Sequence, residues 1–399
     1  MIGAACGDIY KEDAMLPTFT KYSPHLFHAC SWCALLIALA FAFLFLTGPA
    51  AAEPSSRYVD GASGLDSGFC DDPSAPCATI NYAIGQSGDG DTILIAGGEY
   101  RENVKLVDGL ARTITGSYAN NNGQWTAAGE ATVIHGQNAD TTIEIRNQSD
   151  TRIELVRVTG GMGQEDATFG NGCGGFKIQN SDVEIVRAGI RQNTAGTGDG
   201  GGICARGEEE RINLLLDKVF VGGNRAVNSG GGMQLFNTNT TIINSVFTNN
   251  SSASNVANVM LLEDDNVTII NSTIANNNRN NGDQAILLFA GSLTMSNSIM
   301  WENTLNLQAD PPCDECFNVT YSDIEQPTPG TGNISADPLF ANMLQRIFRL
   351  RPNSPCINSG TADGAPVDDL RDNPRDSWPD MGAFEHLWPD HYLPVIGGE

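Results

Sequence analysis

The chain has 399 residues, of which 41% are hydrophobic and only 17% are charged, and its formal net charge is −25. This length allows two average domains or one elongated repeat domain. So acidic a surface repels nucleic-acid phosphates and anionic lipids, and we therefore expect no nucleic-acid partner. The polar surface comes instead from Asn, Thr, Ser and 44 Gly residues, a composition typical of turn-rich β proteins.

The first segment, residues 1–52, is predicted to be a signal peptide with a long n-region. Its uncharged run, Ala34–Leu46, is too short to span a bilayer comfortably, and the small residues of Pro49–Ala52 suit signal peptidase. An uncleaved membrane anchor is the alternative. After this segment no apolar run approaches the roughly 18 residues that a spanning helix needs. We therefore expect a secreted or cell-surface monomer, with no membrane segment after signal cleavage.

Export makes disulfides permissible, and seven cysteines follow the signal segment. Cys70 and Cys77 bracket a proline-containing loop and are the best disulfide candidates. Cys313 and Cys316 form a CxxC motif, which is a loop staple, a redox pair or half of a zinc site. Because the sequence after the signal segment has no second CxxC and no HxxxH motif, we favour the staple. The odd count leaves one thiol over, and Cys356, inside an apolar segment, is the candidate for a buried free cysteine.

Internal repetition is the strongest signal in the rest of the chain. Five 11-residue segments align without gaps and all end in Asn: Val183–Asn193, Leu214–Asn224, Thr240–Asn250, Val267–Asn277 and Leu293–Asn303. Their starts lie 31, 26, 27 and 26 residues apart. Ile153–Gly163 and Ile93–Asn103 look like earlier copies.

Each repeat reads as a short strand, a turn residue and a second short strand, with a third strand before it. Three short strands in about 27 residues match one coil of a parallel β-helix, in which each strand pairs with the next coil about 4.8 Å away. A β-sandwich or a propeller is disfavoured by this spacing and by the lack of hairpin signals. We predict an all-β, single-stranded parallel β-helix of about eight coils. The predicted divisions are an N-terminal cap (53–91), coils (92–303), C-terminal coils and closing motifs (304–386), and a short tail (387–399).

Two sets of asparagines recur in the repeats. The fifth position holds Asn244, Asn271 and Asn297, whose stacked amides are predicted to hydrogen-bond along the axis at a turn. The last position is predicted to mark another turn, because Asn tolerates the left-handed conformation. This second set consists of Asn193, Asn224, Asn250, Asn277 and Asn303. We interpret both sets as structural.

The two ends of the mature chain resemble a known family. Arg57–Val104 resembles the N-terminal cap and first coil of bacterial right-handed parallel β-helix proteins, with Ala78–Ile84 as a short helix that plugs the core. The other end resembles the closing motifs of the "choice-of-anchor Q" group of the pectin-lyase-like fold. Its motifs are Ala336–Phe340, Phe348–Leu350, Ser354–Gly360 and Asp380–Glu385. Asn358 and Met381 depart mildly from that pattern. The resemblance implies a right-handed β-helix and an exported surface protein, but no shared catalytic site.

The fold hosts polysaccharide lyases, glycoside hydrolases and epimerases, but their signatures are missing here. No histidine lies between residues 183 and 303, and no Asp-Pro-His-Asp motif occurs. There is one candidate cation or glycan site. It combines two groups of three acids, which precede equivalent strands in coils two apart, with two basic residues at the fifth repeat position. The acids are Glu208, Glu209, Glu210, Glu263, Asp264 and Asp265, and the basic residues are Arg187 and Lys218. Calcium is the cation that such carboxylates would hold. We favour the alternative of a solvated acidic turn.

Two functions therefore remain open. The first is a non-catalytic surface protein for adhesion or extracellular glycan binding. The second is a calcium-assisted polysaccharide lyase or a glycoside hydrolase that acts on acidic polysaccharide. A groove where three or more carboxylates converge with an arginine would favour the second. Because no catalytic residue is identified, we expect the first, with no cofactor.

Overall fold

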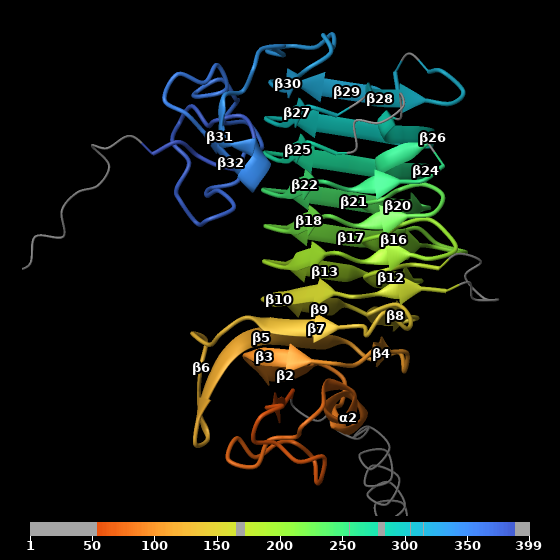
Figure 1. Ribbon diagram of the computed structural model, residues 1–399, viewed down its shortest axis with the longest axis vertical. Helices are drawn as coiled ribbons and strands as arrows, with labels where there is room; N and C mark the ends of the chain where they lie inside the picture. The colour runs from red at the N-terminus through yellow and green to blue at the C-terminus, as the bar shows by residue number, and fades with distance from the viewer. Residues whose placement is uncertain are drawn as a thin grey trace, which may run out of the picture. The chain divides into compact units, whose positions relative to one another are not determined.

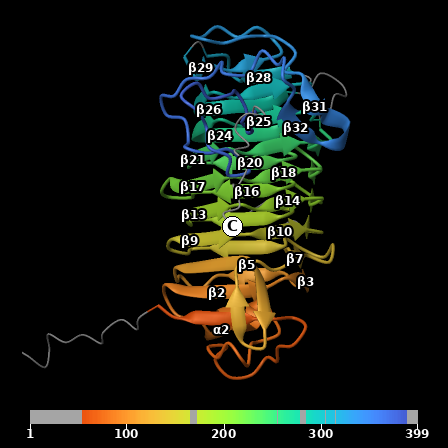
Figure 2. The same cartoon turned by 90° about the vertical axis from the view of Figure 1, so that its left-hand side faces the viewer.

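A computed structural model describes residues 54–164, 172–254, 256–277, 284–303, 305–313 and 315–387. The predicted signal peptide (1–52) lies outside these residues, as does nearly all of the predicted tail (387–399). Within the described ranges, no helix is long and apolar enough to cross a membrane. The structure is nearly all-β, and the predicted right-handed parallel β-helix is confirmed: short strands stack coil upon coil (Figures 1 and 2).

The coils stack their strands in four parallel rows, numbered here in the order in which the chain visits them. Stack 1 contains β4 (Val104–Leu106), β8 (Ile143–Arg146), β12 (Phe176–Gln179), β16 (Ile203–Arg206), β20 (Met233–Phe236), the first halves of β24 (Ala257–Ile270) and β26 (Gln284–Ser296), and β28 (Leu305–Ala309). Stack 2 contains β1 (Ser56–Val59), β2 (Asp91–Ala96), β5 (Arg112–Asn121), β9 (Thr151–Glu154), β13 (Val183–Val186), β17 (Ile212–Asp217), β21 (Thr238–Ile243), the second halves of β24 and β26, and β29 (Phe317–Thr320).

Stack 3 contains β3 (Gly98–Tyr100), β7 (Thr132–His135), β10 (Val156–Thr159), β14 (Gly189–Arg191), β18 (Phe220–Gly222), β22 (Val246–Thr248), β25 (Thr273–Ala275), β27 (Ile299–Trp301) and β30 (Asp323–Ile324). Stack 4 is short, with β11 (Met162–Gly163), β15 (Thr194–Ala195), β19 (Arg225–Ala226) and β23 (Ser251–Ser252). Over the described ranges stack 3 has nine strands, eight of them within residues 92–303, which agrees with the prediction of about eight coils there.

The core is built from inward-facing apolar residues that alternate with outward polar ones, as a half-buried strand requires. In stack 2 the inward positions of successive coils form a fully buried file: Ile153, Ile185, Leu216, Ile242, Ile269 and Met295. One face of each strand is thereby sealed, and the other faces solvent. Function must therefore come from the outward positions, from the turns or from the ends.

The register confirms the five predicted repeats and corrects the two earlier copies. Val183, Leu214, Thr240, Val267 and Leu293 are paired in successive coils. Val183 also pairs with Thr151 rather than with Ile153, and Ile153 aligns with Ile114 and Ile93. The two upstream copies are therefore shifted by two residues from the predicted alignment. A shift of two keeps every apolar residue on the inner face, so the sequence pattern does not reveal it.

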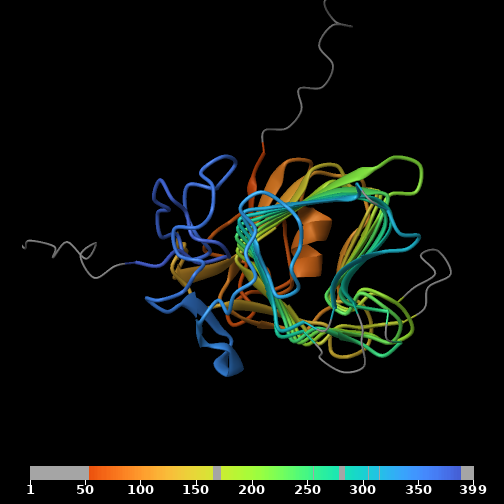
Figure 3. The ribbon, with the colours of Figure 1, turned by 90° about the horizontal axis from the view of Figure 1, so that it is seen from above.

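The predicted N-terminal plug is present as α2 (Ile80–Gln86), which lies inside the outline of the stacked strands when the helix is viewed from above (Figure 3). The Thr79 hydroxyl accepts a hydrogen bond from the Tyr82 amide, which is N-cap geometry. Glu102 accepts hydrogen bonds from the Ile80 and Asn81 amides, which have no partner within the helix. Ile80 and Ala83 then cover the end of the core.

The two asparagine sets largely exchange the details predicted for them, although Asn297 Nδ2 does donate along the axis to Asn271 Oδ1 at 3.2 Å, as predicted for the fifth position. Fifth-position residues are the left-handed ones, with φ of 49° at Asn244, 44° at Asn271 and 50° at Asn297. The last-position asparagines are not left-handed. They form a buried ladder, in which each Nδ2 donates to the Oδ1 of the Asn in the next coil at 3.0–3.1 Å, from Asn193 through Asn303. The left-handed residue of that second turn is the preceding one, such as Asn249 or Asn276.

Three disulfides are present in the described residues. Cys70 pairs with Cys77 and Cys313 with Cys316, as predicted, and Cys356 is a buried free cysteine. A third disulfide joins Cys173 to Cys204 in adjacent coils and was not predicted.

The C-terminal segment packs on the outside of stack 3. It contains the antiparallel pair β31 (Phe340–Asn342) and β32 (Ile347–Leu350), joined by the 3-10 turn η1 (Met343–Gln345). The only other antiparallel pair of the described strands lies near the N-terminal end of the helix, where β5 pairs with β6 (Gln124–Thr126). Phe348, Met381 and Phe384 form a second hydrophobic cluster with Val246 and Ile299, which face outward from β22 and β27. Figure 3 shows this segment beside the coils rather than on top of them.

Candidate functional site

The predicted acidic residues lie along one edge of the coils, where stack 1 turns into stack 2. Glu208 accepts hydrogen bonds from Gln179 at 2.7 Å and from Asn180 at 3.0 Å, and Glu263 accepts one from Gln234 at 3.0 Å. Arg211 reaches across two coils to the carbonyl and the carboxylate of Asp264. These acids are therefore engaged with neighbouring side chains.

Asp265 differs from the other acids because it is fully buried. Its carboxylate accepts hydrogen bonds from the Thr238 amide at 2.7 Å and the Glu263 amide at 2.6 Å. Burial raises the pKa of Asp265 to about 7, although these hydrogen bonds oppose the rise. The carboxylate holds the bend within β24 in place.

The structure does not place Arg187 and Lys218 beside these acids. Both follow strands of stack 2, whereas Glu208–Glu210 precede β17, so the two groups lie at opposite ends of a strand about 20 Å long. Arg187 binds Asp372 through both terminal nitrogens, at 2.9 and 2.6 Å. Buried Lys218 contacts Asp372 at 2.5 Å and Asp368 at 2.9 Å. These two basic residues clamp the C-terminal segment, which corrects their predicted place in the site.

No metal cluster is formed by the described residues: nowhere do three or more His, Cys, Asp or Glu side chains gather in a way that could hold an ion. The calcium site stays a prediction.

A groove of about 710 Å³ runs over the outer face of stack 2, across β5, β9, β13, β17 and β21. A second hollow of about 590 Å³, lined by Glu208, Glu209 and Glu210, shares Asp150, Asp182 and Asn213 with it. The predicted glutamates therefore form one side of a longer polar surface. We call the two hollows together the polar groove.

One wall of the polar groove is a file of exposed polar side chains, one from each coil. Asn213 donates to Asp182 through its amide at 2.7 Å and its side chain at 3.1 Å. The Asn239 side chain donates to Asn213 at 3.3 Å, and the Asn266 side chain donates to Asn239 at 3.2 Å. The parallel register repeats these groups about every 4.8 Å along the axis. The file presents amide donors and oxygen acceptors to solvent at a regular spacing.

The floor of the groove carries an arginine between two glutamates. Arg152 on β9 contacts Glu154 at 2.9 Å and Glu184, on the next coil, at 2.5 Å. Burial lowers the pKa of Arg152, but the hydrogen bonds and charges of the two glutamates raise it by more, so its pKa lies above the usual value. The guanidinium is held as a cation and cannot act as a base.

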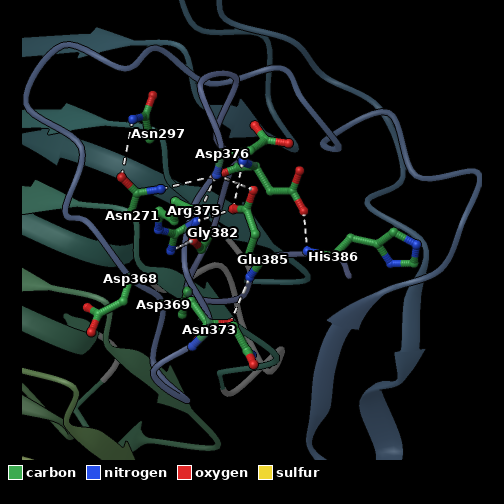
Figure 4. Close-up of polar contacts among 12 residues, drawn as sticks. Asn271, Asn297, Asp368, Asp369, Asn373, Arg375, Asp376, Gly382, Glu385 and His386 are labelled. Atoms are coloured by element: carbon green, nitrogen blue, oxygen red, sulfur yellow. Dashed lines mark hydrogen bonds and ion pairs between the residues drawn. The ribbon is translucent and has the colours of Figure 1, made fainter. Parts of the chain in front are cut away.

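A buried polar cluster lies elsewhere, where the closing motif meets stack 2 and stack 3 (Figure 4). Arg375 contacts Glu385 at 2.9 Å, the Asn244 side chain at 2.9 Å and the Gly382 carbonyl at 3.0 Å. Arg375 and Glu385 are only 2% and 4% exposed. Burial, followed by the charge of Glu385, raises the pKa of Asp380 to about 7.

Fifth-position asparagines tie this cluster to the coils. The side chain of Asn271 donates to the Asp380 carbonyl at 3.0 Å, and that of Asn297 to the Thr361 carbonyl at 2.8 Å. Asn244 likewise donates to the Asp368 carbonyl at 2.9 Å. The cluster therefore latches the C-terminal segment to the β-helix, and its acids are occupied by that role.

Sequence reasoning missed Arg152, Glu154 and Glu184. Glu184 is the second residue of a predicted repeat, and that position faces outward, so the repeat contained the signal for it. Arg152 aligns with Glu184 only in the observed register, which the two-residue shift concealed.

No protein-family profile matches the chain, and no curated protein matches it in sequence. Solved structures with a similar fold include pectate lyase Pel9A, with 14% identity over 85% of this chain and 98% of that one, at a TM-score of 0.41. The tailspike protein gp49 of Acinetobacter baumannii bacteriophage Fri1, a capsular polysaccharide depolymerase, is 11% identical over 72% of this chain and 65% of that one, with a TM-score of 0.29. The GH136 lacto-N-biosidase of Eubacterium ramulus is 9% identical over 68% and 67%, with a TM-score of 0.24. These similarities concern the fold alone.

Proposed function

We propose that this chain is an exported, monomeric β-helix protein that binds an extracellular or cell-surface glycan in the polar groove without cleaving it. The observation that carries the proposal is the file of half-buried Asp182 and exposed Asn213, Asn239 and Asn266, of which the first three line the polar groove. Sugar hydroxyls both donate and accept hydrogen bonds, and the file offers carboxylate and amide partners at a spacing comparable to one sugar ring. A linear glycan lying along the axis would meet the same partners in each coil.

The charge of the groove favours a neutral glycan over an acidic one. Asp150, Asp182 and the three glutamates from 208 to 210 line it, while Arg152 is already paired with two acids. A polyuronate would therefore meet net repulsion on this face. Carboxylates that accept hydrogen bonds from hydroxyls suit uncharged sugars.

Export and membership of the "choice-of-anchor Q" group belong to the same proposal. One segment that carries the resemblance contains α2, which plugs the N-terminal end of the core, and the other lies beside stack 3, with Asp380–Glu385 in the buried latch. The disulfide pairs, including the inter-coil pair Cys173–Cys204, suit an oxidising compartment.

A glycan array probed with residues 53–399 tests the proposal. We expect retention of neutral oligosaccharides that is strongly reduced in the double variant Asn213→Ala, Asn239→Ala. A matched control is Asn121→Ala, an exposed asparagine at the end of β5 and outside the groove. Retention of no glycan, or equal retention by the double variant and the control, would contradict glycan binding in the groove.

An enzymatic function is the second candidate, because Glu154 and Glu184 flank Arg152, and Arg152 and Glu184 line the groove. Asp150 and Asp182 line it as well, but of these three lining carboxylates only Glu184 contacts Arg152, so the expected convergence of three carboxylates on an arginine is met only in part. The raised pKa of Arg152 argues against its use as the base of a lyase. A hydrolase that uses the two glutamates would release reducing ends from a polysaccharide, and Glu184→Gln would abolish the release. Release that survives this variant would exclude the pair.

A further inference from the structure

The outer face of stack 3 carries a basic pocket that the proposed function does not use. The C-terminal segment covers this face over β22, β25 and β27. Over β10, β14 and β18 it leaves a pocket of about 400 Å³, bordered by Leu370. This pocket lies on a different row of strands from the polar groove.

The floor of the pocket is Gly189, on β14. A Cβ atom built on Gly189 would lie 3.7 Å from Arg191 Nε and 3.8 Å from Arg157 Cγ. The missing side chain therefore leaves a recess that the two arginines share. Gly189 does not have a positive φ, so its backbone conformation does not require glycine.

The two arginines lack acidic partners. In the described part of the chain neither Arg157 nor Arg191 forms an ion pair, whereas Arg57, Arg112, Arg152, Arg187, Arg211 and Arg375 all do. The Nε atom of Arg191 is buried and has no hydrogen-bond partner. An unsatisfied buried donor is costly, and an acceptor bound in the recess would satisfy it.

The arginines are also held for binding. The Arg191 guanidinium stacks on the Phe220 ring, 4.0 Å from its centre, which fixes the plane of its donors. Burial, and then the charges of Arg157 and Arg346, lower the pKa of Arg191. Arg157 and Arg191 therefore place two unpaired positive charges at one recess, in a chain whose net charge is −25. An anion would relieve their mutual repulsion.

We propose that Arg157 and Arg191 form an oxyanion-binding site above Gly189 that takes one carboxylate or sulfate group. Planar guanidinium groups match both oxyanions through paired N–H donors. The identification of the oxyanion as part of a saccharide, as a uronic acid or a sulfate ester, rests on the proposed function. The existence of the oxyanion site does not depend on that function.

Calorimetric titration of residues 53–399 tests the site, with sodium sulfate and sodium galacturonate as probes at constant ionic strength set by sodium chloride. We expect saturable binding of at least one probe, weakened about tenfold or more by Arg191→Gln and by Arg157→Gln. A galacturonate trisaccharide and a sulfated disaccharide form the second arm. Either saccharide is expected to bind more tightly than the corresponding small probe if a sugar is the natural source.

Gly189→Val tests the recess without removing a charge, because valine suits a strand and fills the floor. It is expected to weaken binding as much as Arg191→Gln, with an unchanged circular dichroism spectrum. Arg225→Gln, on β19 of stack 4, is the matched control and is expected to leave affinity unchanged. The proposal is overturned if neither small probe binds beyond chloride, or if the Arg157 and Arg191 variants bind as well as the control. Either result leaves glycan retention in the polar groove as a separate question.

Discussion

The buried asparagine ladder is predicted to be a main source of stability, and Asn250→Ala is the sharpest perturbation of it. Asn250 lies in the middle of five stacked asparagines and is fully buried. Its Oδ1 accepts from the Asn224 amide and from Asn224 Nδ2, each at 3.1 Å. Its Nδ2 donates to the Val221 carbonyl at 3.0 Å and to Asn277 Oδ1 at 3.1 Å.

The magnitude follows from what each neighbour loses in the alanine variant. The Asn224 amide loses its acceptor and becomes an unsatisfied buried donor, which costs roughly 1–3 kcal/mol. Asn224 Nδ2 keeps its hydrogen bond to the Ile190 carbonyl, and Asn277 Oδ1 keeps the Asn250 amide. The three remaining lost bonds cost about 1 kcal/mol each at most. We expect the free energy of unfolding to fall by about 4 kcal/mol.

Asn239→Ala is the matched control. Asn239 lies in the same coil as Asn250, but it belongs to the exposed file of asparagines and not to the buried ladder. It also bonds to the asparagines of both neighbouring coils, at 3.3 and 3.2 Å, but in contact with water. Its loss is expected to cost less than about 0.5 kcal/mol. Urea unfolding followed by circular dichroism compares the two variants at a common m-value. A difference of less than about 1 kcal/mol between them would refute the account of the ladder.

Three further predictions concern the latch, the clamp and the inter-coil disulfide. The pKa of Asp380 is raised from 3.8 to about 7, so the folded state binds more protons than the unfolded state between about pH 4 and pH 7. The contribution of Asp380 to stability is therefore complete below pH 4 and is lost as the pH rises to 7. Asp380→Asn should flatten this fall in the free energy of unfolding, and an unchanged slope would contradict the prediction. Asp372→Asn should weaken the clamp that Arg187 and Lys218 form on Asp372 by about 1 kcal/mol. Amide hydrogen exchange should then become faster in the C-terminal segment alone, and exchange at the wild-type rate would count against the clamp. The double variant Cys173→Ser, Cys204→Ser removes a disulfide between residues 31 positions apart in sequence. The free energy of unfolding, measured in urea, should fall by about 3.5 kcal/mol. A fall of less than about 1 kcal/mol would show that the disulfide does not stabilise the fold.

The repeat architecture was predictable because its signal is local and redundant. Gap-free 11-residue segments fix the register of the central coils, and apolar alternation fixes which face is inward. The repeats are read from the sequence itself, whereas the plug helix over Ala78–Ile84 was expected from a family resemblance and is found at Ile80–Gln86.

The roles of the two asparagine positions were harder to assign, because Asn suits both a left-handed turn and an amide ladder. One signal does separate them. The fifth position also holds Arg187 and Lys218, which cannot form an amide ladder, whereas the last position is Asn in five consecutive repeats. The buried ladder forms at the position that holds Asn in all five repeats.

The polar groove and the basic pocket escaped sequence reasoning because both depend on register between coils. Arg152 meets Glu184, and Arg157 approaches Arg191, only after the early coil is shifted by two residues. Arg187 and Lys218 meet Asp372, far along the chain, through a packing contact that no local pattern encodes.

One titration tests whether the polar groove binds a neutral glycan and leaves it intact. An array-selected oligosaccharide is titrated into residues 53–399, and the mass of the recovered ligand is then measured. We predict saturable binding that is lost in the Asn213→Ala, Asn239→Ala variant, with a ligand of unchanged mass. A shortened ligand, or full affinity in that variant, would contradict the account.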